Sequence, residues 1–141
     1  MSYGTMFWGN SPHSPVMFKM QKRVIRILMG ICYRESCRKS FKELKILTLS
    51  SQYIFSLLPF VVHNRGYFAS NIVYHNINTR QKNGLHLPHV SLTMYEKGVF
   101  YSGIKVFNAL PMTIKDISSN PKKFKVTLKH YLLIHLFYSL D

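Results

Sequence analysis

The side chains that could support chemistry in this sequence include two cysteines, Cys32 and Cys37, which are separated by four residues. With His86 and His89 downstream, they have the ligand types of a tetrahedral zinc site. However, the two residues between the histidines fall short of the usual spacing, and Cys32 is expected where a helix ends. We therefore expect no metal and no cofactor, with Cys32 buried and Cys37 exposed.

Carboxylates are scarce, because five Asp and Glu stand against 19 Lys and Arg, which gives a net charge of +14. Polymerases and nucleases that use two metal ions hold them with several carboxylates, and this chain could hardly assemble such a set. Glu35 and Glu43 lie eight residues apart among cations and are expected to be solvated. No segment has the spacing of a glycine-rich phosphate loop. We expect no catalytic residues and no enzyme activity from this chain.

Clustered cations are the stronger chemical signal. Four of them repeat at the spacing of one helical face before the first acid, Glu35, and three more share a face near the end of the chain. Like charges at this spacing repel, whereas phosphates would relieve the repulsion and release counterions. A plain solvated face is the alternative. The sequence predicts non-specific binding of RNA or DNA through Lys19, Lys22, Arg23, Arg26, Lys122, Lys125 and Lys129.

The first four cations belong to a helix predicted to begin at Ser14, as its cap, and to end at Gly30. Apolar residues recur along it at steps of three, four and seven, which predicts one inward face and directs the cations away from the core. The residues of this face are Met17, Met20, Val24, Ile27, Leu28 and Ile31.

Two further helices are predicted before residue 65. One covers Ser36–Leu44, with Ser36 as cap and Phe41 and Leu44 facing inward. The other begins at residue 50 or 51 and is expected to kink or stop near residue 58, because Pro59 lacks a backbone donor.

The middle of the chain, residues 65–92, is rich in Asn and Gly and is expected to be extended and loop-like. A short hairpin over Ile72–Ile77 is an open alternative, and Asn83–Gly84 is a turn signal. Helical periodicity returns from Thr93 to Leu110, where Pro111 ends it.

The last helix is expected to begin at Asn120 and Pro121, as cap and first-turn proline. Its inward face should be Phe124, Leu128, Tyr131 and His135, and its apolar end beyond Tyr131 should be buried, here or against a partner. The sequence therefore predicts one small all-α domain with helical parts over 1–64 and 93–141 and a loop-rich connector over 65–92.

Several short segments, in chain order, resemble one protein family. These are YG and FWGN near the N-terminus, LKILTL and QYIF between residues 44 and 55, GIKVFNALP from Gly103 and NPKKFK from Asn120. Together they are similar to the region just after the polymerase domain in reverse transcriptases of non-LTR retrotransposons of the jockey and related insect types. The sequence departs from the family at Ser50, where a proline is common, and at Pro59, in a helix that is usually unbroken.

The resemblance implies a non-catalytic, C-terminal part of an RNA-directed DNA polymerase, encoded by a mobile element. The metal-binding aspartates of the polymerase and the endonuclease residues lie upstream of this region in the family, so none is carried over here. It also implies a truncated copy that begins at Met1, with an upstream polymerase domain as a partner.

Two other function classes remain open. The same cations could hold the chain on anionic lipid, with residues 131–138 as an apolar anchor. The chain could also be a structural module that packs its apolar end on a polymerase domain. The longest uncharged run, Ile46–Asn64, contains polar residues and a proline, so no transmembrane segment is expected. No secretory signal is recognised, and an intracellular location, nucleus or cytoplasm, is expected.

Overall fold

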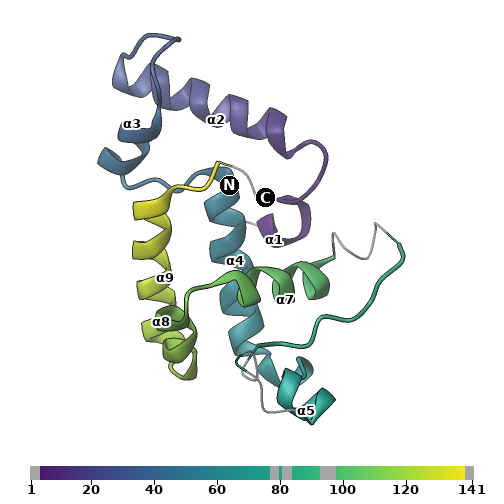
Figure 1. Cartoon of the computed structure of the whole chain (residues 1–141). Coiled ribbons are helices and arrows are strands. Elements are labelled where there is room, and N and C mark those ends of the chain that lie inside the picture. The colour runs from purple at the N-terminus through teal and green to yellow at the C-terminus, as the bar shows by residue number, and fades with distance from the viewer. Residues whose placement is uncertain (1–3, 77–79, 81–83, 93–97, 139–141) are drawn as a thin grey trace. The chain divides into compact units, whose positions relative to one another are not determined.

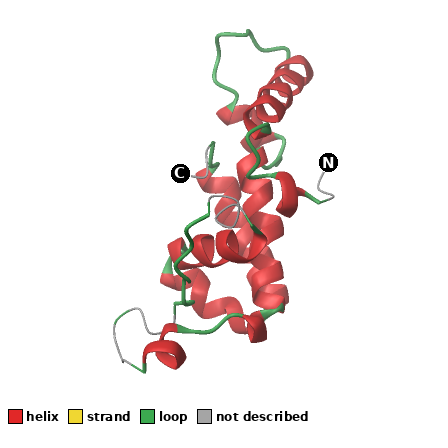
Figure 2. Ribbon diagram, turned by 90° about the vertical axis from the view of Figure 1, so that its right-hand side faces the viewer, coloured by secondary structure: helices red, strands yellow, loops and turns green. Residues whose placement is uncertain are grey.

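Helices make up nearly all regular structure in the part of the chain that the computed structural model describes, which is residues 4–76, 80, 84–92 and 98–138. Figure 1 shows the helices in chain order, and Figure 2 shows helices joined by loops. The elements are α1 (Thr5–Trp8), α2 (Ser14–Met29), α3 (Arg38–Glu43), α4 (Leu49–His63), the 3-10 turn η1 (Arg65–Tyr67), α5 (Asn71–His75), α7 (Val99–Ala109), α8 (Met112–Lys115), the 3-10 turn η2 (Asp116–Ser119) and α9 (Pro121–His135). The predicted all-α class is confirmed.

The chain divides into two compact units. The first unit comprises residues 1–55 and 127–141, and the second comprises residues 56–126. Both α4 and α9 run from one unit into the other. Each unit has buried apolar residues of its own.

The core of the first unit joins α2, α3 and the residue that follows α9. Ile25, Cys37, Phe41 and Leu136 are buried together, and half-buried apolar side chains surround them. Phe41 therefore faces inward as predicted. The expectation for Leu44 is wrong, because this residue lies beyond the end of α3 and is exposed.

The ends of α2 are only partly as predicted. Gly30 adopts the left-handed conformation (φ 62°), its N–H bonds the Ile27 carbonyl, and the Ile31 N–H bonds the Arg26 carbonyl. This is a Schellman motif, so the predicted C-terminus is confirmed. At the other end His13 takes the cap position, and the Ser14 hydroxyl instead donates to the Gly9 carbonyl over 2.7 Å. A similar shift places Cys37, and not Ser36, at the cap position of α3.

The helix α4 begins earlier and runs further than predicted. Thr48 caps it, since its hydroxyl oxygen accepts a hydrogen bond from the Ser51 N–H over 3.3 Å. The helix then continues through Pro59 to His63, so of the two predicted outcomes, a kink or a stop near residue 58, the stop is wrong. A proline inside a helix costs about 3 kcal/mol. Leu57 and Leu58, which are fully buried, provide the packing that offsets this cost.

In the second unit α4 and α7 approach closely. A Cβ atom added to Gly103 would lie 2.7 Å from a methyl group of Val61, so only glycine fits there without a shift. Asn108, also on α7, bonds the Leu85 N–H over 2.9 Å through its side-chain oxygen and the Leu85 carbonyl over 2.8 Å through its amide nitrogen. One side chain thereby satisfies both backbone groups of a buried loop residue.

The hairpin alternative for Ile72–Ile77 is wrong for residues 72–75, which are helical in α5, and residue 77 lies outside the described residues. In place of a hairpin, the described residues of the nearby segments form an isolated bridge between Ser70 and Leu85. Asn83 of the predicted turn and residues 93–97 of the predicted helix also lie outside the described residues. From Val99 that helix is present, and it ends before Pro111 as expected.

The predicted start of α9 is confirmed, because the Asn120 side chain accepts a hydrogen bond from the Lys123 N–H over 3.4 Å. Its inward face differs from the prediction beyond residue 128. Phe124 and Leu128 are fully buried, but Tyr131 is half-buried and His135 is exposed. The buried row continues in steps of four, through residues 132 and 136, each one position beyond the predicted residue.

Candidate functional site

The helix α2, which carries four of the predicted site residues, buries a different face from the predicted one. Ile25 is 2% exposed, whereas Ile27 is 72% exposed. Met20, Val24 and Leu28 are exposed as well. The prediction that these apolar residues face the core is therefore wrong; Met17 and Ile31, from the same set, are half-buried.

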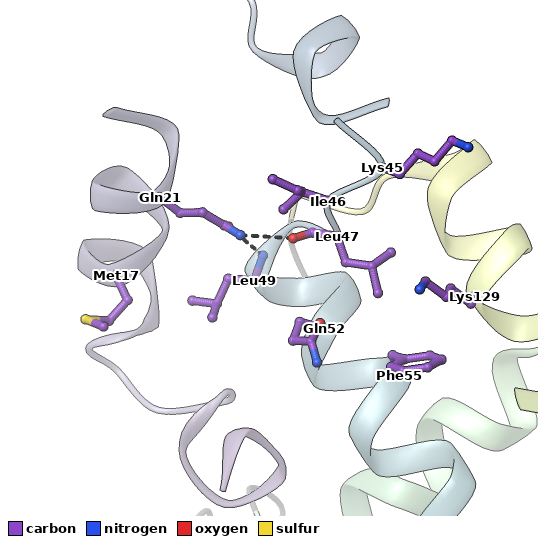
Figure 3. Close-up of a pocket in the computed structure, with 9 residues that line it drawn as sticks. All are labelled: Met17, Gln21, Lys45, Ile46, Leu47, Leu49, Gln52, Phe55 and Lys129. Atoms are coloured by element: carbon purple, nitrogen blue, oxygen red, sulfur yellow. Dashed lines mark hydrogen bonds between the residues drawn. The ribbon is translucent and has the colours of Figure 1, made fainter. Parts of the chain in front are cut away.

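The reason lies in the polar and aromatic residues of the buried face. The Gln21 side chain donates to the Leu47 carbonyl and accepts from the Leu49 N–H, each over 2.9 Å, as the dashed lines in Figure 3 show. Leu47 and Leu49 are buried, so their backbone groups need partners within the protein. On the same face the Phe18 ring packs edge-on against Tyr138 at 5.1 Å. The spacing of apolar residues along α2 reveals neither the Gln21 hydrogen bonds nor the Phe18–Tyr138 contact.

This orientation separates the four cations of α2. Lys19 and Arg23 are exposed, but Lys22 and Arg26 are half-buried, so the prediction that all four point away from the core is wrong. The Lys22 ammonium lies 4.7 Å from the centre of the Phe18 ring. The Arg26 guanidinium lies 5.1 Å from the centre of another ring, that of Tyr33. Cation–π contacts of this kind stabilise half-buried cations.

Two of the predicted residues, Lys19 and Lys22, line one pocket of about 330 Å³ in the first unit, which we call the Lys19–Lys22 pocket. No acidic residue lines it. Its walls combine hydroxyl, amide and aromatic groups with the two ammonium groups. The lining residues are Gly9, Asn10, Ser11, Ser14, Pro15, Phe18, Lys19, Lys22, Leu49, Ser50 and Tyr138.

The electrostatics of the Lys19–Lys22 pocket favour an anion. Residues from the first turns of two helices line it, Ser14 and Pro15 of α2 and Leu49 and Ser50 of α4. Neither helix has an acidic residue in its first turn, so their positive dipole ends add to the lysine charges. Burial raises the pKa of Tyr138, another lining residue, further above its ordinary value of 10.0, so this hydroxyl adds no negative charge to the pocket. The pocket suits a phosphate group, which accepts hydrogen bonds on several oxygens.

A second pocket, of about 310 Å³, contains a third predicted residue, Lys129, and is drawn in Figure 3. Lys129 extends from α9 toward α4, and Lys45 lies in the turn directly after α3. The apolar part of the lining consists of Met17, Ile46, Leu47, Leu49 and Phe55. Sequence analysis did not find Lys45, because it belongs to no helical face and its backbone is left-handed (φ 52°).

The remaining predicted residues do not converge. Lys122 and Lys125 are exposed on α9, and neither lines either of these pockets. Arg23 and Arg26 line neither pocket as well. The structure thus places Lys19 and Lys22 in the lining of one pocket and Lys45 and Lys129 in the lining of the other.

The cysteines are placed opposite to the expectation, since Cys32 is exposed and Cys37 is buried. Cys37 faces inward because it lies at the start of α3, where its thiol is 3.8 Å from the Lys22 carbonyl. Glu35 and Glu43 are exposed. Within the described ranges, no three His, Cys, Asp or Glu side chains gather to hold a metal ion.

Comparison with known proteins found no matching family model, no matching curated protein and no matching solved structure. Among the described residues, every helix is too short or too polar to span a bilayer.

Proposed function

We propose that this chain binds the phosphate backbone of RNA or DNA without sequence preference, with the Lys19–Lys22 pocket as the main contact. The observation that carries the proposal is the pairing of two lysines in an acid-free pocket beside the first turns of two helices. Helix N-termini and lysines both bind phosphate, and their effects add where they face one group. Lys122, Lys125 and Lys129 are exposed cations on α9 and offer further phosphate contacts.

We also propose that the chain is a non-catalytic C-terminal part of a retrotransposon reverse transcriptase, which acts in the nucleus or cytoplasm. The ordered sequence segments support this, together with the scarcity of carboxylates. A purified chain should extend no primer on any template with magnesium or manganese. Nucleotide incorporation above a boiled control would overturn this part of the proposal.

The binding proposal is tested with the double variant Lys19→Gln/Lys22→Gln and a fluorescent single-stranded RNA of mixed sequence. Glutamine removes the charge and keeps a polar, unbranched side chain only one atom shorter, which matters because Lys22 packs on a ring. The affinity is followed by anisotropy from about 50 to 200 mM salt. Loss of two phosphate contacts should lower the magnitude of the log–log salt slope by about 1.4, at about 0.7 per contact.

The matched control is Lys39→Gln/Lys42→Gln, which removes the same charge from exposed positions of α3 in the first unit. This control should change the salt slope much less than the pocket variant. Equal changes in the two variants would mean that net charge alone drives binding, and the pocket assignment would be withdrawn. Affinities that differ strongly between RNA sequences would contradict the absence of base readout.

A further inference from the structure

The helix α2 leaves a continuous apolar surface exposed. Its side chains are between 52% and 72% exposed, and their spacing of three or four residues places them on one face. We name this surface the α2 stripe. It consists of Val16, Met20, Val24, Ile27 and Leu28.

The edge of the α2 stripe is positively charged. Lys19 and Arg23 are exposed and precede Met20 and Val24 directly in the sequence, so both flank the stripe on the same side. The helix has four cations and no acidic residue along its whole length. An occupant of the stripe must therefore be apolar at its centre and anionic at its margin.

A second copy of this chain does not meet that requirement. Two α2 helices packed stripe to stripe would place their exposed cations near one another without an acid to neutralise them. The shape also matters, since no stripe residue lines either of the two pockets described above. The stripe is a ridge on a single helix, and a ridge inserts readily into a fluid apolar layer.

We propose that α2 docks on the surface of an anionic lipid bilayer, with the α2 stripe in the acyl boundary and Lys19 and Arg23 at the lipid phosphates. Charge complementarity and the one-sided apolar surface are the features of helices that lie in the plane of a bilayer. A helix of this length is about 24 Å long, at about 1.5 Å per residue. The proposal goes beyond nucleic-acid binding, because its apolar contacts come from the α2 stripe, which lines no part of the Lys19–Lys22 pocket. Lys19 alone takes part in both.

The test uses sedimentation with vesicles of phosphatidylcholine, with or without about 30% phosphatidylserine. Wild type should bind the anionic vesicles and bind the neutral ones much more weakly. The variant Val24→Ser/Ile27→Ser should lose about tenfold or more in partitioning to the anionic vesicles, because it removes two apolar contacts and no charge. The matched control, Val73→Ser/Val126→Ser, changes exposed residues outside α2 and should partition like wild type.

RNA binding separates this proposal from the proposed function. The stripe variant should bind RNA with wild-type affinity and salt slope, while Lys19→Gln/Lys22→Gln should show the lowered RNA salt slope given above. Because Lys19 also contacts the lipid phosphates, this charge variant should bind anionic vesicles more weakly than wild type, and its remaining partitioning should still depend on the stripe residues. Equal vesicle binding by wild type and the stripe variant would mean that the cations alone hold the lipid. Absence of wild-type binding, or a stripe-dependent dimer in solution, would also overturn the proposal.

The depth of α2 in the bilayer can also be measured directly, with variants that still bind the vesicles. Wild type and the variants all contain Trp8, which provides the background fluorescence. In the Ile27→Trp variant, brominated lipids should quench a larger fraction of the tryptophan fluorescence than in wild type. With Val126→Trp, the quenching should equal that of wild type. Equal quenching of both variants would place α2 away from the acyl boundary and refute the docking geometry.

Discussion

Two isoleucines of α2 provide a decisive test of how this helix is oriented. Ile25 is 2% exposed and packs with Cys37 and Phe41, whereas Ile27, two positions away, is 72% exposed. Replacement of a buried isoleucine by alanine costs about 2–5 kcal/mol, from lost burial and the cavity that remains. The same replacement at an exposed site usually stays within about 0.5 kcal/mol, and alanine slightly favours the helix. We expect Ile25→Ala to be less stable than Ile27→Ala by at least about 2 kcal/mol.

The assay is urea unfolding followed by far-UV circular dichroism. At a slope of about 2 kcal/mol per molar urea, the two midpoints should differ by about 1 M or more. The helix, the residue type and the chemical change are the same in both variants, so differences in propensity cancel. Equal midpoints, or a lower midpoint for Ile27→Ala, would mean that the periodicity predicts the buried face correctly. The orientation of α2 in the structure would then be refuted.

Two further predictions concern other parts of the chain. Gly103→Ala should destabilise the protein by about 1–3 kcal/mol, because the added Cβ would lie 2.7 Å from a Val61 methyl group. Thermal unfolding measures this loss. The control is Gly66→Ala, whose added Cβ would meet no atom within 4 Å and should leave the stability unchanged. Burial raises the pKa of Tyr138 above 10.0, so the stability that its neutral form provides is present below pH 10 and is lost as the pH rises through the raised pKa. Tyr138→Phe should therefore lose less stability than wild type between about pH 9 and 11, measured as the melting temperature at each pH. Equal decreases of the melting temperature in the two proteins would contradict a role of Tyr138 ionisation in this loss.

The parts of the fold that sequence predicts correctly depend on residues close together in the chain. Gly30 and Asn120 end or begin their helices through bonds to residues within four positions, and these signals are local. The helix stop predicted at Pro59 is wrong for the opposite reason. The cost of the proline is local, but the burial that offsets it includes contact with residues distant in sequence, since Leu57 lies beside Gly103 of α7.

The candidate site follows the same division. Sequence alone finds the cations of α2, because their spacing and the absence of acids are visible in one short stretch. It does not find the pocket around Lys19 and Lys22, because α2 forms only part of its lining. The rest comes from three other segments, which lie before α2, at the start of α4 and after α9. Nor does it find the role of Gln21, a polar residue whose partners, Leu47 and Leu49, are more than 25 positions away.

The orientation of α2 also changes the explanation for any self-association of the purified chain. The composition of the last helix suggests its apolar end as the cause, but Leu132 and Leu136 are fully buried there. Ile134 is 51% exposed at that end, whereas the α2 stripe exposes five apolar side chains on one helix face, on the helix whose Gln21 bonds the start of α4. If Gln21 holds this orientation, the same two hydrogen bonds place Lys19 and Lys22 in the pocket and turn the stripe outward. Phosphate binding and exposure of the stripe are then two consequences of one packing choice, and a change that lets α2 rotate should remove both together.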